Sequence, residues 1–231
     1  MKTFIITVTH HPESLKLANR CYDSCMKYGI KPEITPAFTP KDNPLHLINT
    51  IIGKNVENNF EQQPRPDAVA ACFASQLMLW SRCATQEQNF LILEHDAVMK
   101  RPLPNIDFEG VVTHGKPSWG LEGRPEETGV GVLPHEGGFL GNHAYQMKPS
   151  AARYIMDWLR GEDSRPLEPA DTFLNSYWFP FIEKCRPYCF EVEETFTLIQ
   201  SGDTIKMKDN IDFKNYRELD ADEHFYNHVK S

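Results

Sequence analysis

Short apolar runs and amphipathic stretches alternate along the opening part of the chain. Residues 2–8 form an apolar run, and such a run bounded by polar residues predicts a buried strand. Residues 10–30 carry apolar side chains at helical spacing, and residues 31–38 return to strand character. A strand, a helix and a second strand in succession are typical of a parallel sheet.

The helix expected over residues 10–30 has recognisable ends. Pro12 is expected in its first turn and Gly29 at its C-cap, the positions that suit these two residue types. The side chains expected on its buried stripe are Leu15, Ala18, Cys21, Tyr22 and Cys25.

Two further features precede the middle of the chain. Residues 39–66 are rich in Asn, Pro and Gln, which predicts a loop with one short helix. A longer helix is expected from Asp67 to Ala84, with Asp67 as its N-cap. The apolar positions at helical spacing in it are Ala71, Cys72, Leu79 and Cys83.

The remainder of the chain continues this mixture, and the whole pattern predicts an α/β fold. Residues 115–138 carry many glycines and few large apolar side chains, which favours an active-site loop. No structure is assigned from residue 201 onward. Strands are expected at residues 90–96, 110–115, 139–148 and 189–200, and helices at residues 149–161 and near Asp171.

Composition and charge narrow the class of protein. The chain has 231 residues, of which 40% are hydrophobic and 24% charged, as expected for a globular domain with a sizeable core. Its net charge of -8 argues against bulk electrostatic binding to nucleic acid. No apolar run is as long as a membrane span.

The six cysteines show no metal-binding spacing, so a zinc site is not favoured. The N-terminal apolar stretch is ended by His10, His11 and Pro12, too early for a signal peptide. We therefore expect reduced thiols and a cytoplasmic location.

Candidate chemistry lies at the end of the apolar run Phe90–Leu93, which is followed at once by Glu94, His95 and Asp96. Alternation along a strand would point Glu94 and Asp96 the same way. Two adjacent carboxylates repel each other unless a cation, a basic side chain or solvent separates them. One interpretation of this pair is that it binds a divalent metal that holds a diphosphate. The other is that it is simply the solvated end of a strand.

A wider series of motifs resembles glycosyltransferase family 25, the lipopolysaccharide and collagen galactosyltransferase group. The segments ACFASQLMLW, FLILEHDAVM, GGFLGNHAYQMKPSAARYIM, EPADTFLN and FTLIQSGDTI occur in the order typical of that family. The resemblance covers about residues 67–206. It implies a GT-A fold, a nucleotide-diphospho-sugar transferase fold with a central, mostly parallel sheet flanked by helices.

The resemblance also assigns roles to individual residues. Asp96 would bind Mn²⁺ or Mg²⁺, and Glu94 would lie near the metal or the ribose of the donor. Asp171, in the Pro-x-Asp motif, would be the catalytic base, with Glu168 as the alternative base. The competing interpretation is that Asp171 only caps the following helix. His143, within the Gly-x-x-Ala-Tyr segment 141–145, would bind a sugar hydroxyl.

The chain departs from the family pattern at several positions. His95 replaces the middle aspartate of the acidic triplet, and Gln76 replaces a histidine after Ser75. The family's Asn-Leu and arginines after the first strand are missing, so nucleotide contacts from Thr7, Thr9 and His10 rest on position alone. Leu79 and Trp80 are read as core residues.

The resulting hypothesis is one glycosyltransferase domain over residues 1–231. Its parts are a nucleotide-binding β-α-β unit (1–66), a family-like core (67–206) and a C-terminal tail (207–231). The reaction expected is metal-dependent, inverting transfer of galactose or glucose from a UDP-sugar to a glycan, such as lipopolysaccharide, or to a protein acceptor. A catalytically silent nucleotide-sugar or glycan-binding protein is the alternative, followed by a metal-dependent hydrolase or nucleotidyltransferase.

Overall fold

A seven-stranded sheet in the order β2-β1-β3-β7-β5-β8-β6 forms the centre of the molecule. The computed structural model describes residues 1–63, 65–116, 129–132, 142–162 and 164–192. The seven strands are β1 (Lys2–Thr7), β2 (Glu33–Pro36), β3 (Phe90–Glu94), β5 (Val111–Thr113), β6 (Gly129–Val132), β7 (Ala144–Met147) and β8 (Ile182–Arg186). A separate two-stranded sheet pairs β4 (Ala97–Met99) with β9 (Phe190–Val192).

Most strands of the large sheet run in one direction. β1 is parallel to both β2 and β3, and β5 is parallel to β8. β7 lies antiparallel between β3 and β5, and β6 is antiparallel to β8. Five strands therefore point one way and two the other, which confirms the α/β class with a mainly parallel, GT-A-like sheet.

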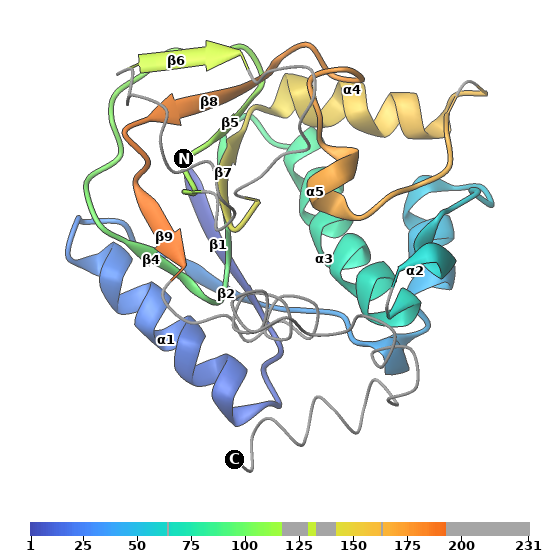
Figure 1. Ribbon diagram of the computed structural model, residues 1–231, viewed down its shortest axis with the longest axis horizontal. Coiled ribbons are helices and arrows are strands. Elements are labelled where there is room, and N and C mark those ends of the chain that lie inside the picture. Colours follow the sequence, from blue (N-terminus) through green and yellow to red (C-terminus); the bar gives the residue numbers. More distant parts are fainter. Residues whose placement is uncertain (64, 117–128, 133–141, 163, 193–231) are drawn as a thin grey trace, which may run out of the picture.

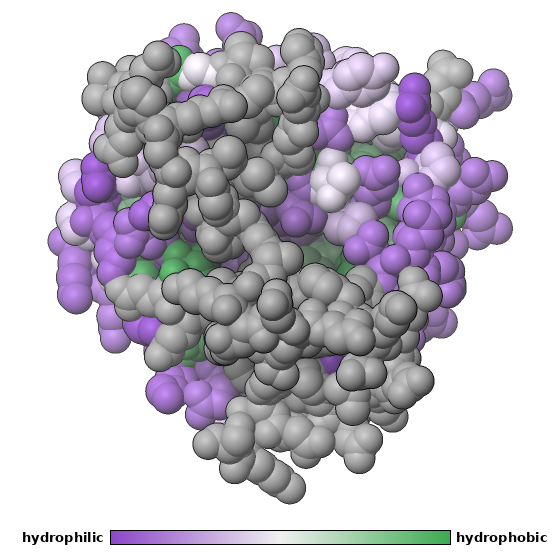
Figure 2. Space-filling model, in the orientation of Figure 1, coloured by the Kyte–Doolittle hydropathy of each residue, from purple (hydrophilic) through white to green (hydrophobic). Residues whose placement is uncertain are grey.

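Helices cover both faces of this sheet (Figure 1). α1 (Pro12–Met26) packs on one face, beside β4. α2 (Pro44–Ile52), α3 (Pro66–Ala84), α4 (Pro149–Arg160) and the short α5 (Ala170–Phe173) lie on the other. Two 3-10 turns, η1 (Pro40–Asp42) and η2 (Phe60–Gln62), flank α2. In the view of Figure 2 the outer surfaces of α1 and α2 are mainly hydrophilic, as their amphipathic sequences require.

Alternation along the buried strands divides the core in two. Phe90 and Ile92 of β3 join the larger cluster beneath α3 and α4, whereas Leu91 and Leu93 join the smaller cluster beneath α1. Glu94 continues the even-numbered series, and so its side chain emerges on the α3 face. This placement brings the first carboxylate of the candidate motif next to α3.

Most expected elements are present, but their ends differ in instructive ways. α1 ends at Met26 with Lys27 as its C-cap, and Gly29 lies in the following turn at a φ of 76°. The N-cap of α3 is Arg65 rather than Asp67, because Pro66 occupies the first helical position, where its missing N–H costs nothing. The expected buried positions Leu15, Tyr22 and Cys72 are partly or largely exposed.

The region 39–66 contains the expected short helix, the nine-residue α2, together with the two 3-10 turns. Other segments differ from the expectation in kind. Residues 129–132 of the expected active-site loop form β6, and β8 was not expected at all. Residues 117–128 and 133–141, the expected strand beyond residue 192 and the tail 207–231 lie outside the described residues.

Tight packing near β5 gives a test of the core. A Cβ added at Gly110 would lie 2.5 Å from Phe181 Cδ2 and 3.0 Å from Ala151 Cβ, whereas one added at Gly131 would meet no heavy atom within 4 Å. We predict that Gly110→Ala lowers the free energy of unfolding by about 1–3 kcal/mol because the site is already filled. Gly131→Ala is the matched control in urea denaturation, and equal midpoints for the two variants would contradict this packing.

Candidate functional site

Glu94 ends the central strand β3 and is held from two sides. Its backbone N–H donates to the His143 carbonyl at 2.9 Å, just before β7 begins. Its Oε1 accepts a 3.4 Å hydrogen bond from Gln76 Nε2 on α3. Burial raises the pKa of Glu94 to about 8, with the charges of Asp96 and Asp171 adding to the rise.

Gln76 belongs to a buried chain of hydrogen bonds that ends at Glu94. Trp80 Nε1 donates to the Tyr145 hydroxyl at 2.7 Å, and that hydroxyl donates to Gln76 Oε1 at 2.7 Å. Gln76 then donates to Glu94 through its amide nitrogen. Trp80 and Tyr145 are fully buried, so every polar group of this chain needs its partner.

This chain of hydrogen bonds explains two sequence motifs together. The sequence analysis read Trp80 as a core residue, and the structure adds that its indole N–H orients Tyr145 of the Gly-x-x-Ala-Tyr segment. The neighbouring Ser75 has a structural role as well. Its hydroxyl donates to the Ala71 carbonyl at 2.8 Å and accepts from the Phe38 N–H at 2.9 Å, which fixes the segment after β2.

Asp96 does not continue the alternation of β3. His95 and Asp96 form a turn between β3 and β4, and Asp96 is fully buried whereas Glu94 is partly exposed. The pKa of the Cys21 thiol on α1 is raised by its hydrogen bond with Cys25, by burial and by the charge of Asp96. Asp96 is therefore also close to α1, on the opposite face of the sheet from Gln76.

The carboxylate of Asp96 is the best candidate for a cation ligand. Neither of its oxygens accepts a hydrogen bond from any residue that the structure describes. Burial raises its pKa to about 6, and the neighbouring His143 and Arg20 oppose that rise. A buried carboxylate without a partner costs free energy, and a divalent cation would remove this cost.

A metal at this position would need ligands from its substrate. No three His, Cys, Asp or Glu side chains in the described part of the chain gather into a cluster that could hold an ion by themselves. Mg²⁺ is usually bound by one or two carboxylates together with phosphate oxygens and water. Glu94 and Asp96 fit that pattern as the protein's share of the ligands.

Asp171 lies close to Glu94, although the two residues are far apart in the sequence. It lies in the first turn of α5, where Oδ1 accepts a 3.0 Å hydrogen bond from the Thr172 N–H. Burial raises its pKa, and its negative charge contributes to the raised pKa values of Glu94 and Cys72. Pro169 is the N-cap of α5, so Asp171 lies in the first turn of the helix and is not its cap. Asp171 lies close to Glu94, and its role as the catalytic base stays a prediction.

Cys72, one turn before Gln76 on α3, lies next to these carboxylates. The residue is solvent-exposed, yet burial by the surrounding protein, followed by the charges of Glu94, Asp171 and Asp96, raises the pKa of its thiol well above the ordinary value. The five other cysteines are buried, and none of the six forms a disulfide. Sequence reasoning placed Cys72 in the core and missed this position.

Of the two histidines of the site, His143 is buried and His95 is half-buried, and both favour the neutral form. Burial lowers the pKa of His95 to about 4, and it also lowers the pKa of His143, where Asp96 acts in the opposite direction. His143 faces Asp96 rather than open solvent, with 6% of its surface exposed. Its predicted contact with a sugar hydroxyl stays a prediction.

The three predicted nucleotide contacts at the end of β1 differ in accessibility. Thr7 is fully buried, and its hydroxyl is hydrogen-bonded to the Ser14 hydroxyl at 2.8 Å, which ties β1 to α1. Thr9 and His10 are exposed. Since the carboxyl ends of parallel strands β1 and β3 meet at one edge, Thr9 and His10 remain candidates for a ligand contact. Glu168 lies three residues before Asp171 and lines a separate pocket.

The chain of hydrogen bonds from Trp80 to Glu94 can be tested through its contribution to the stability of the protein. Tyr145→Phe removes the hydroxyl that accepts from Trp80 and donates to Gln76 and leaves a buried N–H without its partner. We predict a loss of about 1–3 kcal/mol in the free energy of unfolding, measured by urea denaturation. Tyr154→Phe, at a tyrosine that is 52% exposed, is the matched control. An unchanged urea midpoint for Tyr145→Phe would show that this chain of hydrogen bonds adds nothing to the free energy of unfolding.

The raised pKa of Glu94 predicts how stability depends on pH. In the folded state Glu94 keeps its proton up to about pH 8, whereas the unfolded chain releases it near 4.5. The folded state therefore binds more protons in this window, and the metal-free protein should lose stability as pH rises from about 5 to about 8. Glu94→Gln should flatten this slope in denaturation measured at several pH values. An equally steep slope in the variant would contradict the assignment.

Comparison with known proteins gives one family match. Residues 1–108 match the family model of glycosyltransferase family 25, described as an LPS biosynthesis protein. The match includes β1, α1, α3, β3 and the Glu94–Asp96 triplet, and it confirms the resemblance read from the sequence. No curated protein compared with the chain matches it. No helix in the described residues has the length and apolarity needed to cross a membrane.

Proposed function

We propose that this chain, whose residues 1–108 match glycosyltransferase family 25, transfers a hexose from a UDP-sugar to a hydroxyl of a glycan such as lipopolysaccharide. The sugar proposed is galactose or glucose, and the reaction is metal-dependent and inverting. One observation supports this most directly: Glu94 and Asp96 of the matched segment lie close to Asp171, which comes from the other half of the chain.

Glu94 and Asp96 are the proposed ligands of Mn²⁺ or Mg²⁺ on the donor side. When bound, the ion would neutralise the negative charge that develops on the departing nucleotide diphosphate. Gln76 keeps Glu94 in place through its amide nitrogen, and the raised pKa values of both carboxylates indicate that they lack a counter-charge. Thr9 and His10, exposed after β1, are the proposed contacts to the nucleotide.

Asp171 is the proposed general base on the acceptor side. As the acceptor oxygen forms its bond to the anomeric carbon, its proton would pass to the Asp171 carboxylate. The bond from that carbon to the diphosphate oxygen would break, and its electron pair would leave with UDP. Burial raises the pKa of Asp171, which makes its carboxylate a stronger base than a solvated aspartate.

His95 changes the charge of the family's acidic triplet without removing its outer carboxylates. With a pKa of about 4 it is neutral at physiological pH, so the triplet contains two carboxyl groups and a neutral imidazole rather than three carboxyl groups. The backbone of the same turn leads into β4 and positions Asp96. We therefore propose that His95 has a structural rather than an ion-binding role.

Two substitutions separate the donor side from the acceptor side. Asp96→Asn should abolish Mn²⁺-dependent binding of UDP, because the buried carboxylate is the proposed ligand. Asp171→Asn should leave UDP binding unchanged and lower kcat by about a hundred- to ten-thousand-fold. The measurement is calorimetric UDP binding together with UDP release from UDP-galactose and UDP-glucose, with delipidated lipopolysaccharide core oligosaccharides as acceptors.

Asp157→Asn is the matched control, since Asp157 is an exposed residue of α4 whose side chain is 78% accessible. Metal-dependent UDP binding without any UDP release by the unmodified protein would favour the silent binding protein. Release of UMP, or release that no acceptor stimulates, would favour the hydrolase or nucleotidyltransferase. Near-normal transfer by Asp171→Asn would assign the base elsewhere, with Glu168 as the next candidate.

A further inference from the structure

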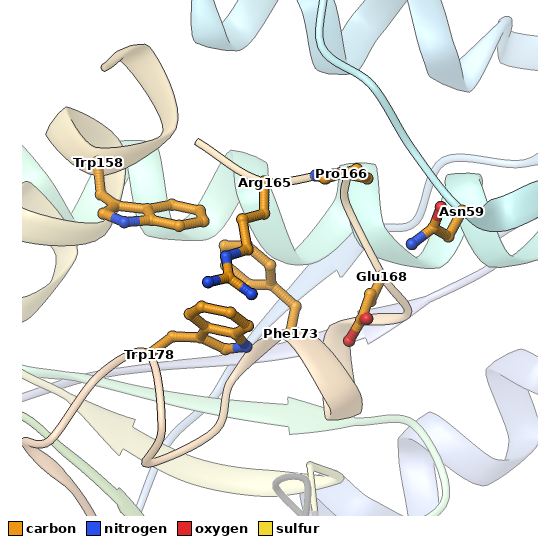
Figure 3. Close-up of a pocket in the computed structure, with 7 residues that line it drawn as sticks. All are labelled: Asn59, Trp158, Arg165, Pro166, Glu168, Phe173 and Trp178. Carbon is orange, nitrogen blue, oxygen red and sulfur yellow. The ribbon is translucent and has the colours of Figure 1, made fainter. Parts of the chain in front are cut away.

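A pocket lies between α4 and the segment that leads into α5 (Figure 3). Its volume is about 200 Å³. Pockets for drug-sized ligands measure roughly 300–1,000 Å³, so this one suits a single small ring. Its lining includes Asn59, Trp158, Arg165, Glu168, Phe173 and Trp178.

Aromatic rings form one side of the pocket. The ring centres of Trp158 and Trp178 are 6.5 Å apart, and both side chains are half-buried. Trp158 packs edge-on against Phe173 and Phe179 at 5.8 and 5.6 Å, which makes it a fixed surface. Flat, partly exposed aromatic faces bind the apolar C–H faces of ring-shaped ligands at little entropic cost.

Polar side chains complete the pocket. The Arg165 guanidinium lies 3.7 Å from the centre of the Trp178 ring, and Glu168 and Asn59 are drawn on the other side in Figure 3. Among the described residues neither Arg165 nor Glu168 has a hydrogen-bond or ion-pair partner for its side chain. A carboxylate that accepts and a guanidinium that donates match a ligand whose hydroxyls do both.

The backbone around the pocket is well fixed. The Asn59 N–H donates to the Leu167 carbonyl at 2.7 Å, and the Leu167 N–H donates to the Glu57 carbonyl at 2.8 Å. Asn59 and the segment that carries Arg165 and Glu168 are thus tied together although they are far apart in the sequence. The polar groups are therefore held by backbone structure before any ligand binds.

The position of the pocket relates it to the proposed base. α5 carries Asp171 and Phe173, and two residues along a helix point in roughly opposite directions. Phe173 lines the pocket, whereas the charge of Asp171 acts on Glu94 and Cys72. A ligand in the pocket would therefore lie next to the reacting position, on the far side of α5, rather than at it.

We propose that this pocket binds one uncharged sugar ring of the acceptor glycan, a residue next to the one that receives the hexose. This inference rests on the proposed function, because it assigns the acceptor of the same reaction. The ring would stack on Trp158, because the Arg165 guanidinium already covers one face of Trp178. Its hydroxyls would donate to Glu168 and accept from Arg165 and Asn59. The opposite charges of Arg165 and Glu168 balance, which favours a neutral sugar over a phosphorylated one.

Direct binding tests the pocket without turnover. The probe is delipidated lipopolysaccharide core oligosaccharide, titrated without donor or metal and followed by tryptophan fluorescence and saturation-transfer NMR. Arg165→Met keeps an apolar stem over Trp178 and removes the donors, and it should weaken binding by about tenfold or more. Arg101→Met, at another exposed arginine, is the matched control and should bind as the unmodified protein does.

Kinetics separate this proposal from the proposed function. Arg165→Met should raise the acceptor KM about tenfold and leave UDP binding and acceptor-independent UDP release unchanged. Unchanged oligosaccharide binding and acceptor KM in Arg165→Met, with normal transfer, would overturn the pocket and leave the transferase intact. Oligosaccharide binding that Arg165→Met weakens, without UDP release from any donor, would support the pocket and overturn the transferase.

Discussion

The burial of three carboxyl groups close to one another is the constraint around which the site is built. The charges of Asp96 and Asp171 add to the raised pKa of Glu94, and burial raises the pKa of each of the three. Asp96 has no hydrogen-bond partner among the described residues, although Arg20 and His143 lie nearby. A fold that maintains such a cluster gives up stability, and a cation that arrives with the substrate would recover it.

The rest of the structure holds this cluster in place. β3 is central in the sheet, between β1 and β7, so Glu94 cannot move without disturbing both neighbours. The hydrogen bonds from Trp80 through Tyr145 and Gln76 fix its side chain from the opposite direction. α5 then brings Asp171 from beyond the matched segment, and Phe173 of the same helix lines the pocket of tryptophans. Donor and acceptor chemistry would thus share one short helix.

The sequence predicted those features that depend on local patterns. Period-two and helical spacing identified β1, α1, α3, β3 and α4. A family resemblance grouped Glu94, Asp96 and Asp171 in one predicted site, and the structure places the charges of Asp96 and Asp171 near Glu94. Contacts between distant residues were not predictable, above all the hydrogen bond between Gln76 and Tyr145. The alternation of side chains did not extend to His95 and Asp96, because the strand ends at Glu94. Pro44 and Gly53, which bracket α2, were readable start and stop signals for the one short helix expected in residues 39–66.

The central claim is that a metal-bound nucleotide diphosphate binds next to Glu94, Asp96 and Asp171. Cys72 allows this claim to be tested directly. It is the one exposed cysteine, and all six cysteines lie in described residues. Its modification by a methanethiosulfonate reagent at pH 9 would be followed by intact-protein mass spectrometry. UDP with Mn²⁺, at ten times its dissociation constant, should slow the reaction about tenfold, and UDP with a chelator should not. An equal rate of modification in both conditions would contradict the account.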